Sequence, residues 1–227
     1  MPIHKDDFAY FMKQAQIKIP GASDAGIKEE LFDVLDEFCE DSLAWRETLT
    51  IPILAGTTTG NVSSNTTYTL TPQDGGYIFM LIGVWDPNNI PQPAYLPTGE
   101  GGGVSIGLLT FVNPYNINQT MSVAVAKTVT LPNDAKEVPI FSETLFRRWH
   151  RYILDGLVGK MMDQPNKSFT DQKQADYHLR RWESGKAMAR TQTERENTYG
   201  AQAWSFPQGF RTRGQRGGVS TANPTQF

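Results

Sequence analysis

The sequence predicts an α+β protein: an α-helical bundle that carries an inserted antiparallel β-sandwich or barrel-like domain and is followed by an extended C-terminal arm. In two separate regions, apolar residues repeat every three or four positions, as they do along one side of a helix. Between these regions they alternate with polar residues, as they do along a strand. We therefore assign residues 1–46 and 142–198 to the bundle, 47–141 to the β domain and 199–227 to the arm.

Two helices are expected in the N-terminal part of the bundle. Residues 5–16 form the first, which ends before Pro20. The second begins after Ser23, and its apolar stripe extends from Ile27 to Trp45. A solvated surface is the commonest role of its acidic face, and the alternatives are a wall that repels DNA or a face that pairs with a basic neighbour. This acidic face includes Glu29, Asp33, Asp36, Glu37 and Glu40.

Strands are expected in the β domain, where the period of the apolar residues changes to two. The continuous apolar run from Tyr77 to Trp85 is typical of a strand buried on both faces. Loops rich in Gly, Pro, Asn, Ser and Thr separate the strands. One of them contains Gly99–Gly103, which lacks the Gly-Lys-Ser/Thr ending of a phosphate-binding loop. The expected strands cover residues 49–53, 67–71, 77–85, 104–112 and 121–131.

Two further helices are expected in the C-terminal part of the bundle, and the short loop between them makes them antiparallel. The first begins after its N-cap, Ser142, and ends near Asp163, shortly before a proline. Ser168 and Asp171 form a capping box that begins the second, which extends to about Arg195. These helices carry a basic face made of Arg147, Arg148, Arg151, Arg180 and Arg181.

The C-terminal arm has neither helical nor strand periodicity and is rich in Gly, Gln, Ser, Thr and Pro. An isolated chain of this composition is expected to be disordered. Because aromatic and arginine side chains dominate the energetics of interfaces, the arm is expected either to anchor on a partner or to be an idle tail. The candidate contact residues are Trp204, Phe206, Phe210, Arg211, Arg213, Arg216 and Phe227.

The net charge of −3 conceals opposite charges in different parts of the chain. Residues 1–47 contain eleven acids and five bases, whereas residues 147–195 contain eleven bases and six acids. This separation suits self-assembly or the steering of a charged partner, although solvated helix faces are the commoner explanation. No apolar run reaches the roughly 20 residues of a membrane span, so we expect no membrane insertion and synthesis inside the cell.

The sequence contains no motif for catalysis, for a cofactor or for a metal. The histidines show no ligand spacing, although antiparallel helices could bring His150 and His178 together. Cys39 is the single cysteine, and neighbouring carboxylates would reduce its reactivity. We therefore expect that the chain is not an enzyme. The clustered arginines permit nucleic-acid binding, but the acidic pI of about 5.6 and the missing base-reading motif argue against sequence-specific recognition.

An acidic amphipathic helix, a β region and two C-terminal helices follow one another in the chain, with recognisable motifs at their junctions. The motif segments are Phe38–Leu49, Leu131–Ala135, Phe146–Gly156, Met161–Pro165 and a helix that bears Tyr177 and Trp182. As an ordered set, over about residues 23–195, they resemble the head-to-tail adaptor (connector) proteins of tailed bacteriophages, of the tail tubular protein A type.

This resemblance implies a structural virion protein that is made in the host cytoplasm and located at the head-to-tail junction. Copies would form a homo-oligomeric ring, a dodecamer in that family, between the portal protein and a downstream tail or nozzle protein. DNA would pass through the channel without sequence-specific binding, and the arm would reach the portal. The acidic face would line the lumen or meet the basic face of the next copy.

Two other classes of protein remain as alternatives. Another ring-forming tail component, such as a stopper, collar or tail-tube protein, would share the same general organisation. A small nucleic-acid-binding protein is the more remote alternative.

Overall fold

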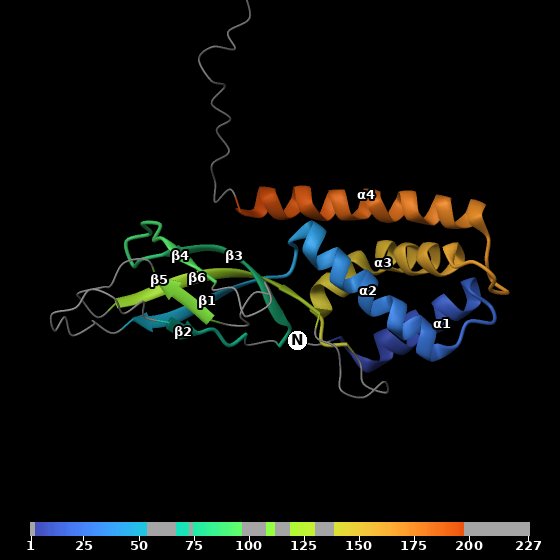
Figure 1. Ribbon diagram of the computed structural model, residues 1–227, viewed down its shortest axis with the longest axis horizontal. Coiled ribbons are helices and arrows are strands. Elements are labelled where there is room, and N and C mark those ends of the chain that lie inside the picture. Colours follow the sequence, from blue (N-terminus) through green and yellow to red (C-terminus); the bar gives the residue numbers. More distant parts are fainter. Residues whose placement is uncertain are drawn as a thin grey trace, which may run out of the picture.

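The computed structural model contains four helices and two small antiparallel sheets in the part of the chain that it describes, so the predicted α+β class is confirmed. Figure 1 shows the helices side by side and the strands at one end of them. The described residues are 3–53, 67–72, 75–96, 108–111, 119–129 and 139–197.

The four helices lie close to their predicted positions. They are α1 (Lys5–Lys18), α2 (Asp24–Ser42), α3 (Glu143–Asp163) and α4 (Gln172–Asn197). Ser23 caps α2 as expected, because its hydroxyl accepts a hydrogen bond from the backbone N–H of Gly26 at 3.2 Å. Ser142 is the N-cap residue of α3, but its side chain makes no capping hydrogen bond.

Two predicted helix boundaries are wrong. Trp45 is not part of α2, because the helix ends at Ser42 and Leu43 adopts a left-handed backbone conformation with a φ of 51°. Ser168 does not begin α4. The Oδ1 atom of Asp171 instead accepts hydrogen bonds from the backbone N–H groups of Lys173 and Gln174, both at 3.1 Å, so Asp171 itself is the cap.

The strands form two three-stranded sheets. The larger sheet has the order β1 (Arg46–Ile53), β6 (Gln119–Thr128) and β3 (Tyr77–Trp85), with both neighbours of β6 antiparallel to it. The smaller sheet has the order β2, β5 and β4, also antiparallel. Its strands are β2 (Thr67–Thr69), β5 (Leu108–Phe111) and β4 (Ala94–Tyr95).

The prediction that the strand from Tyr77 to Trp85 is buried on both faces is wrong. Within β3 only Ile78 and Val84 are buried, and 42% of Met80 is exposed. The strand lies at the edge of its sheet, whereas β6 lies in the centre. An apolar run shows that a segment is hydrophobic, but its place in the sheet depends on which strands pair with it.

The described residues form two hydrophobic cores. The first lies between the helices, where Phe38 of α2 packs against Trp149 and Trp182 with ring centroids 6.1 and 5.7 Å away. The second lies within the strands and includes Leu49, Leu109, Phe111, Met121 and Val123. Trp45, Val129 and Phe141 flank the strands in the chain but belong to the first core, so they attach the β region to the helices.

The close packing of α3 against α4 depends on glycines of α3. A Cβ atom at Gly156 would lie only 2.7 Å from Cδ2 of Trp182, and Trp182 is almost completely buried. The two helices therefore approach each other more closely than larger side chains would allow.

Replacing Gly156 by alanine should destabilise the fold. Alanine favours a helix over glycine by roughly 1 kcal/mol, but displacing a buried tryptophan ring costs up to about 3 kcal/mol. We expect the free energy of unfolding in urea to fall by about 2 kcal/mol. Gly26→Ala is the control, since a Cβ there meets only the Ser23 hydroxyl. Equal stabilisation by both substitutions would contradict this packing argument.

Candidate interaction surfaces

A group of charged side chains joins α4 to α2. The ammonium group of Lys186 contacts a carboxylate oxygen of Glu37 and lies 2.7 Å from Asp41 and 2.9 Å from Glu183. Lys160 of α3 lies 2.6 Å from the other carboxylate oxygen of Glu37. Only 7% of the Lys186 side chain is exposed, so its charge depends on these carboxylates for compensation.

The pKa values of this group follow from the same contacts. Burial by itself would lower the pKa of Lys186, but hydrogen bonds to Asp41, Glu37 and Glu183 outweigh burial and raise it. Burial would raise the pKa of Glu37, but Lys160 and Lys186 outweigh burial and lower it below its ordinary value of 4.5. The stabilisation from ionised Glu37 is therefore present above pH 4.5 and is lost as the pH falls through the lowered pKa.

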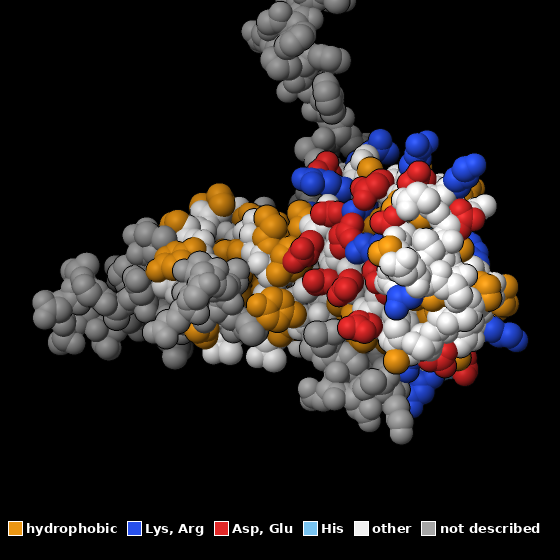
Figure 2. Space-filling view, turned by 45° about the vertical axis from the view of Figure 1, so that its right-hand side comes forward, with side chains coloured by type: hydrophobic (Ala, Val, Ile, Leu, Met, Phe, Trp, Pro, Cys, Tyr) orange, Lys and Arg blue, Asp and Glu red, His pale blue; other side chains and the backbone are white. Residues whose placement is uncertain are grey.

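The remaining acidic residues of α2 differ in their surroundings. Glu29, Asp33 and Glu40 are exposed, and Asp33 and Glu40 form no ion pair with any residue that the structure describes. Asp36 is half-buried and accepts a hydrogen bond from the Thr128 hydroxyl. Figure 2 shows acidic side chains gathered where the helical part of the molecule meets the hydrophobic surface of the β part.

A groove with a volume of about 390 Å³ lies at this junction. Its lining combines carboxylates of α2 with aromatic side chains of α2 and β3. Burial raises the pKa of Glu40, and the negative charges of Asp36 and Asp41 raise it further. The residues that line the groove are Phe32, Asp33, Asp36, Glu40, Tyr77, Phe79, Thr128 and Val129.

The predicted basic residues are partly used within the chain. Arg147 pairs with Asp7 at 3.0 Å and with Glu143 at 2.9 Å. Arg148 lies over the ring of Trp149, with its guanidinium carbon 5.8 Å from the ring centroid. The other three differ: Arg181 pairs with Asp155, whereas Arg151 and Arg180 are exposed and have no ion pair among the described residues.

Asp155 is a buried residue that sequence reasoning missed. It lies on α3, and His178 Nδ1 is 2.8 Å from its Oδ1 while Arg181 Nη2 is 3.0 Å from its Oδ2. A buried carboxylate requires such partners, so this group joins α3 to α4. The available signal was a single acid in the apolar run Ile153–Val158. His178 thus faces Asp155 and not His150, which antiparallel helices could have brought beside it.

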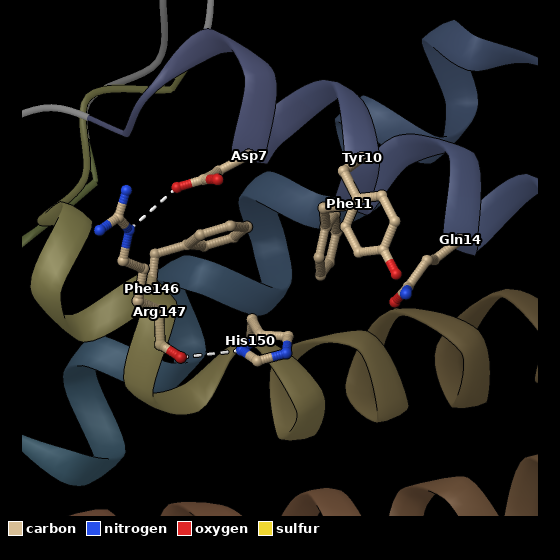
Figure 3. A pocket seen from close by; sticks show the side chains of 7 residues that line it. All are labelled: Asp7, Tyr10, Phe11, Gln14, Phe146, Arg147 and His150. Carbon is tan, nitrogen blue, oxygen red and sulfur yellow. Dashed lines mark hydrogen bonds and ion pairs between the residues drawn. The ribbon is translucent and has the colours of Figure 1, made fainter.

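His150 instead lines a pocket of about 150 Å³ between α1 and α3. Figure 3 shows Phe11 and Phe146 in this pocket, and their ring centroids are 5.2 Å apart. The Asp7–Arg147 ion pair lies at its edge, and His150 Nδ1 lies 2.8 Å from the backbone oxygen of Arg147. The pocket is also lined by Tyr10 and Gln14.

These contacts do not form a catalytic group within the described residues. His150 has no carboxylate, hydroxyl or thiol partner there, so no nucleophile and base are paired around it. The described residues also contain no group of three or more His, Cys, Asp or Glu side chains that could hold a metal ion. Cys39 is buried, and burial raises the pKa of its thiol.

The helices that the structure describes include none that is long and apolar enough to cross a membrane.

The predicted contact residues of the arm lie outside the described residues. They are Trp204, Phe206, Phe210, Arg211, Arg213, Arg216 and Phe227. No model of a known protein family matches the chain, and comparison with curated proteins finds no significant match.

Replacing Lys186 by methionine should weaken the attachment of α4 to α2. The substitution keeps most of the side-chain volume but leaves Glu37 and Asp41 close together without their shared cation. Because these carboxylates retain some contact with water, we expect a loss of about 2–3 kcal/mol in the free energy of unfolding at pH 7. Lys173→Met, at an exposed position of the same helix, should change it by less than about 0.5 kcal/mol. Similar effects of the two substitutions would refute the role given to Lys186.

Proposed function

We propose that the chain is a structural virion protein, a head-to-tail adaptor that assembles into a ring between the phage portal and the tail. Its function is geometric: identical subunits in head-to-tail contact close into a ring whose channel lets DNA pass. The proposal assigns no chemical reaction, cofactor or sequence-specific contact with DNA to the chain. A dodecamer is the proposed stoichiometry, by resemblance to the adaptor family.

The observation that carries this proposal is the separation of opposite charges on one helical unit. Glu29 and Asp33 are exposed on α2, and Arg148 and Arg151 are exposed on α3. Both helices bury their apolar sides in the same core, so their charged sides face away from that core in different directions. A subunit with an acidic side and a basic side can contact identical neighbours through two different surfaces, as ring closure requires.

The same proposal gives each part of the chain a role in the assembly. The helices act as a bundle that builds the ring, and the β region acts as an inserted sandwich-like domain that contacts neighbouring tail proteins. The C-terminal arm reaches the portal. Support comes from the attachment of the β region to the helical core through Trp45, Val129 and Phe141, which leaves most of the strands outside that core.

A charge-exchange experiment tests the ring. Native mass is measured for the chain alone and with a portal ring from the same virion, using Glu29→Lys/Asp33→Lys and Arg148→Glu/Arg151→Glu variants. Each variant alone should assemble at least about tenfold more weakly, because like charges would then meet at every contact. An equal mixture should assemble again, since the reversed faces complement each other in alternating order.

Asp6→Lys/Asp176→Lys is the matched control, because it makes the same change in net charge on α1 and α4. This control should assemble normally. A ring that forms with Glu29→Lys/Asp33→Lys alone would mean that the acidic face does not join subunits. A chain that never assembles, with or without the portal, would contradict the adaptor function itself.

Deleting residues 198–227 should weaken binding to the portal without unfolding the remaining chain. The deletion leaves α4 through Asn197 and both hydrophobic cores intact. We expect co-sedimentation with the portal ring to fall by at least about tenfold, since aromatic and arginine anchors dominate interface energies. The helical circular dichroism of the truncated chain should match that of the full chain. Undiminished co-sedimentation would exclude the arm as the portal contact.

A further inference from the structure

The groove between α2 and the larger sheet combines two kinds of side chain that suit one kind of ligand. Asp33, Asp36 and Glu40 supply carboxylates from successive turns of α2. Tyr77 and Phe79 of β3 supply aromatic rings. Arginine matches both, because its planar guanidinium group forms paired hydrogen bonds with carboxylates and stacks on aromatic faces. The groove therefore fits an extended segment with arginine and aromatic residues.

Among the described residues, no cation compensates the carboxylates of the groove as Lys186 compensates their neighbours on the same helix. Glu37 and Asp41 are compensated by Lys186. By contrast, the described residues that line the groove include no lysine or arginine. The partial burial of Glu40 beside Asp36 brings two negative charges together, and an incoming cation would relieve their repulsion.

The chain itself contains a segment of matching chemistry. Residues 204–216 carry the aromatic residues Trp204, Phe206 and Phe210 and no acid. The same segment carries three arginines, at Arg211, Arg213 and Arg216. Its charge is opposite to that of the groove, and its aromatic residues can pack against Tyr77 and Phe79.

The segment begins within reach of the groove. The contact between Lys186 and Asp41 places the C-terminal half of α4 beside the C-terminal end of α2. An extended chain from Asn197 to Trp204 spans up to about 23 Å. The groove residues Asp33 and Glu40 lie within about 12 Å of Asp41 along the axis of α2. Asn197 lies about 16 Å beyond Lys186 along α4, and Figure 1 shows this end of α4 on the side of the molecule where α2 leads into the strands. The linking chain therefore allows binding within one molecule.

We propose that the groove between α2 and β3 binds residues 204–216 of the same chain. This inference goes beyond the adaptor function, because it concerns the free subunit before any partner is present. Binding in the groove shields Trp204, Phe206 and Phe210 from water and from premature contacts between subunits. A portal that takes up the arm must then displace it from the groove.

A spin label on the segment tests the proposal in the full-length chain. Gln208→Cys places a reactive thiol between Phe206 and Phe210, while the buried Cys39 stays unlabelled. The electron paramagnetic resonance spectrum should show an immobilised label. Asp33→Lys/Glu40→Lys should convert it to a mobile one, and so should reversal of the three arginines to glutamate. Combining the two sets of substitutions should immobilise the label again, since lysines in the groove would then face glutamates on the segment.

Asp6→Lys/Asp176→Lys is again the matched control and should keep the label immobilised. Circular dichroism checks that every variant is folded, and Asp33 and Glu40 are suitable positions because both are exposed. A label that is equally mobile in the unmodified and reversed chains would overturn the proposal. Immobilisation that disappears on dilution would overturn it too, because the occupant would then be the arm of a second copy.

Discussion

The contact between α2 and α4 is the constraint on which the rest of the structure depends. It joins helices from opposite ends of the described chain: Phe38 packs on Trp182, and Lys186 pairs with Glu37 and Asp41. A lysine buried to this degree is tolerated only with compensating carboxylates, so the charges specify which faces meet. Once these helices are joined, α3 packs against both of them and the β region extends from one end (Figure 1).

The same contact decides which charges remain for other molecules. Glu37 and Arg181 are members of the acidic and basic faces by sequence, but both are paired within the chain. Glu29, Asp33 and Arg151 stay exposed. Surface ion pairs contribute little to the stability of a single subunit, whereas separated charged faces strongly influence which surfaces associate. The division between internal and external charges is therefore central to the proposed assembly.

The elements of the fold could largely be predicted because they depend on local signals. The cap at Ser23, the end of α3 at Asp163 and the start of β3 at Tyr77 all follow from residues close in sequence. The errors have physical causes as well. The apolar stripe of α2 seemed to include Trp45, but the helix ends three residues earlier, at Ser42. The ring of Trp45 packs edge-on against that of Phe141, with the ring centroids 5.3 Å apart.

The sequence by itself determined the helical and strand segments and the unequal distribution of charge, because periodicity and composition are properties of neighbouring residues. Only the tertiary structure decided that Asp155 would be paired with His178, or that Asp36 and Glu40 would lie beside Tyr77 in one groove. These pairings join residues far apart in the chain, and their positions depend on how α2, α3 and the strands pack. Local patterns contain no information about such distances.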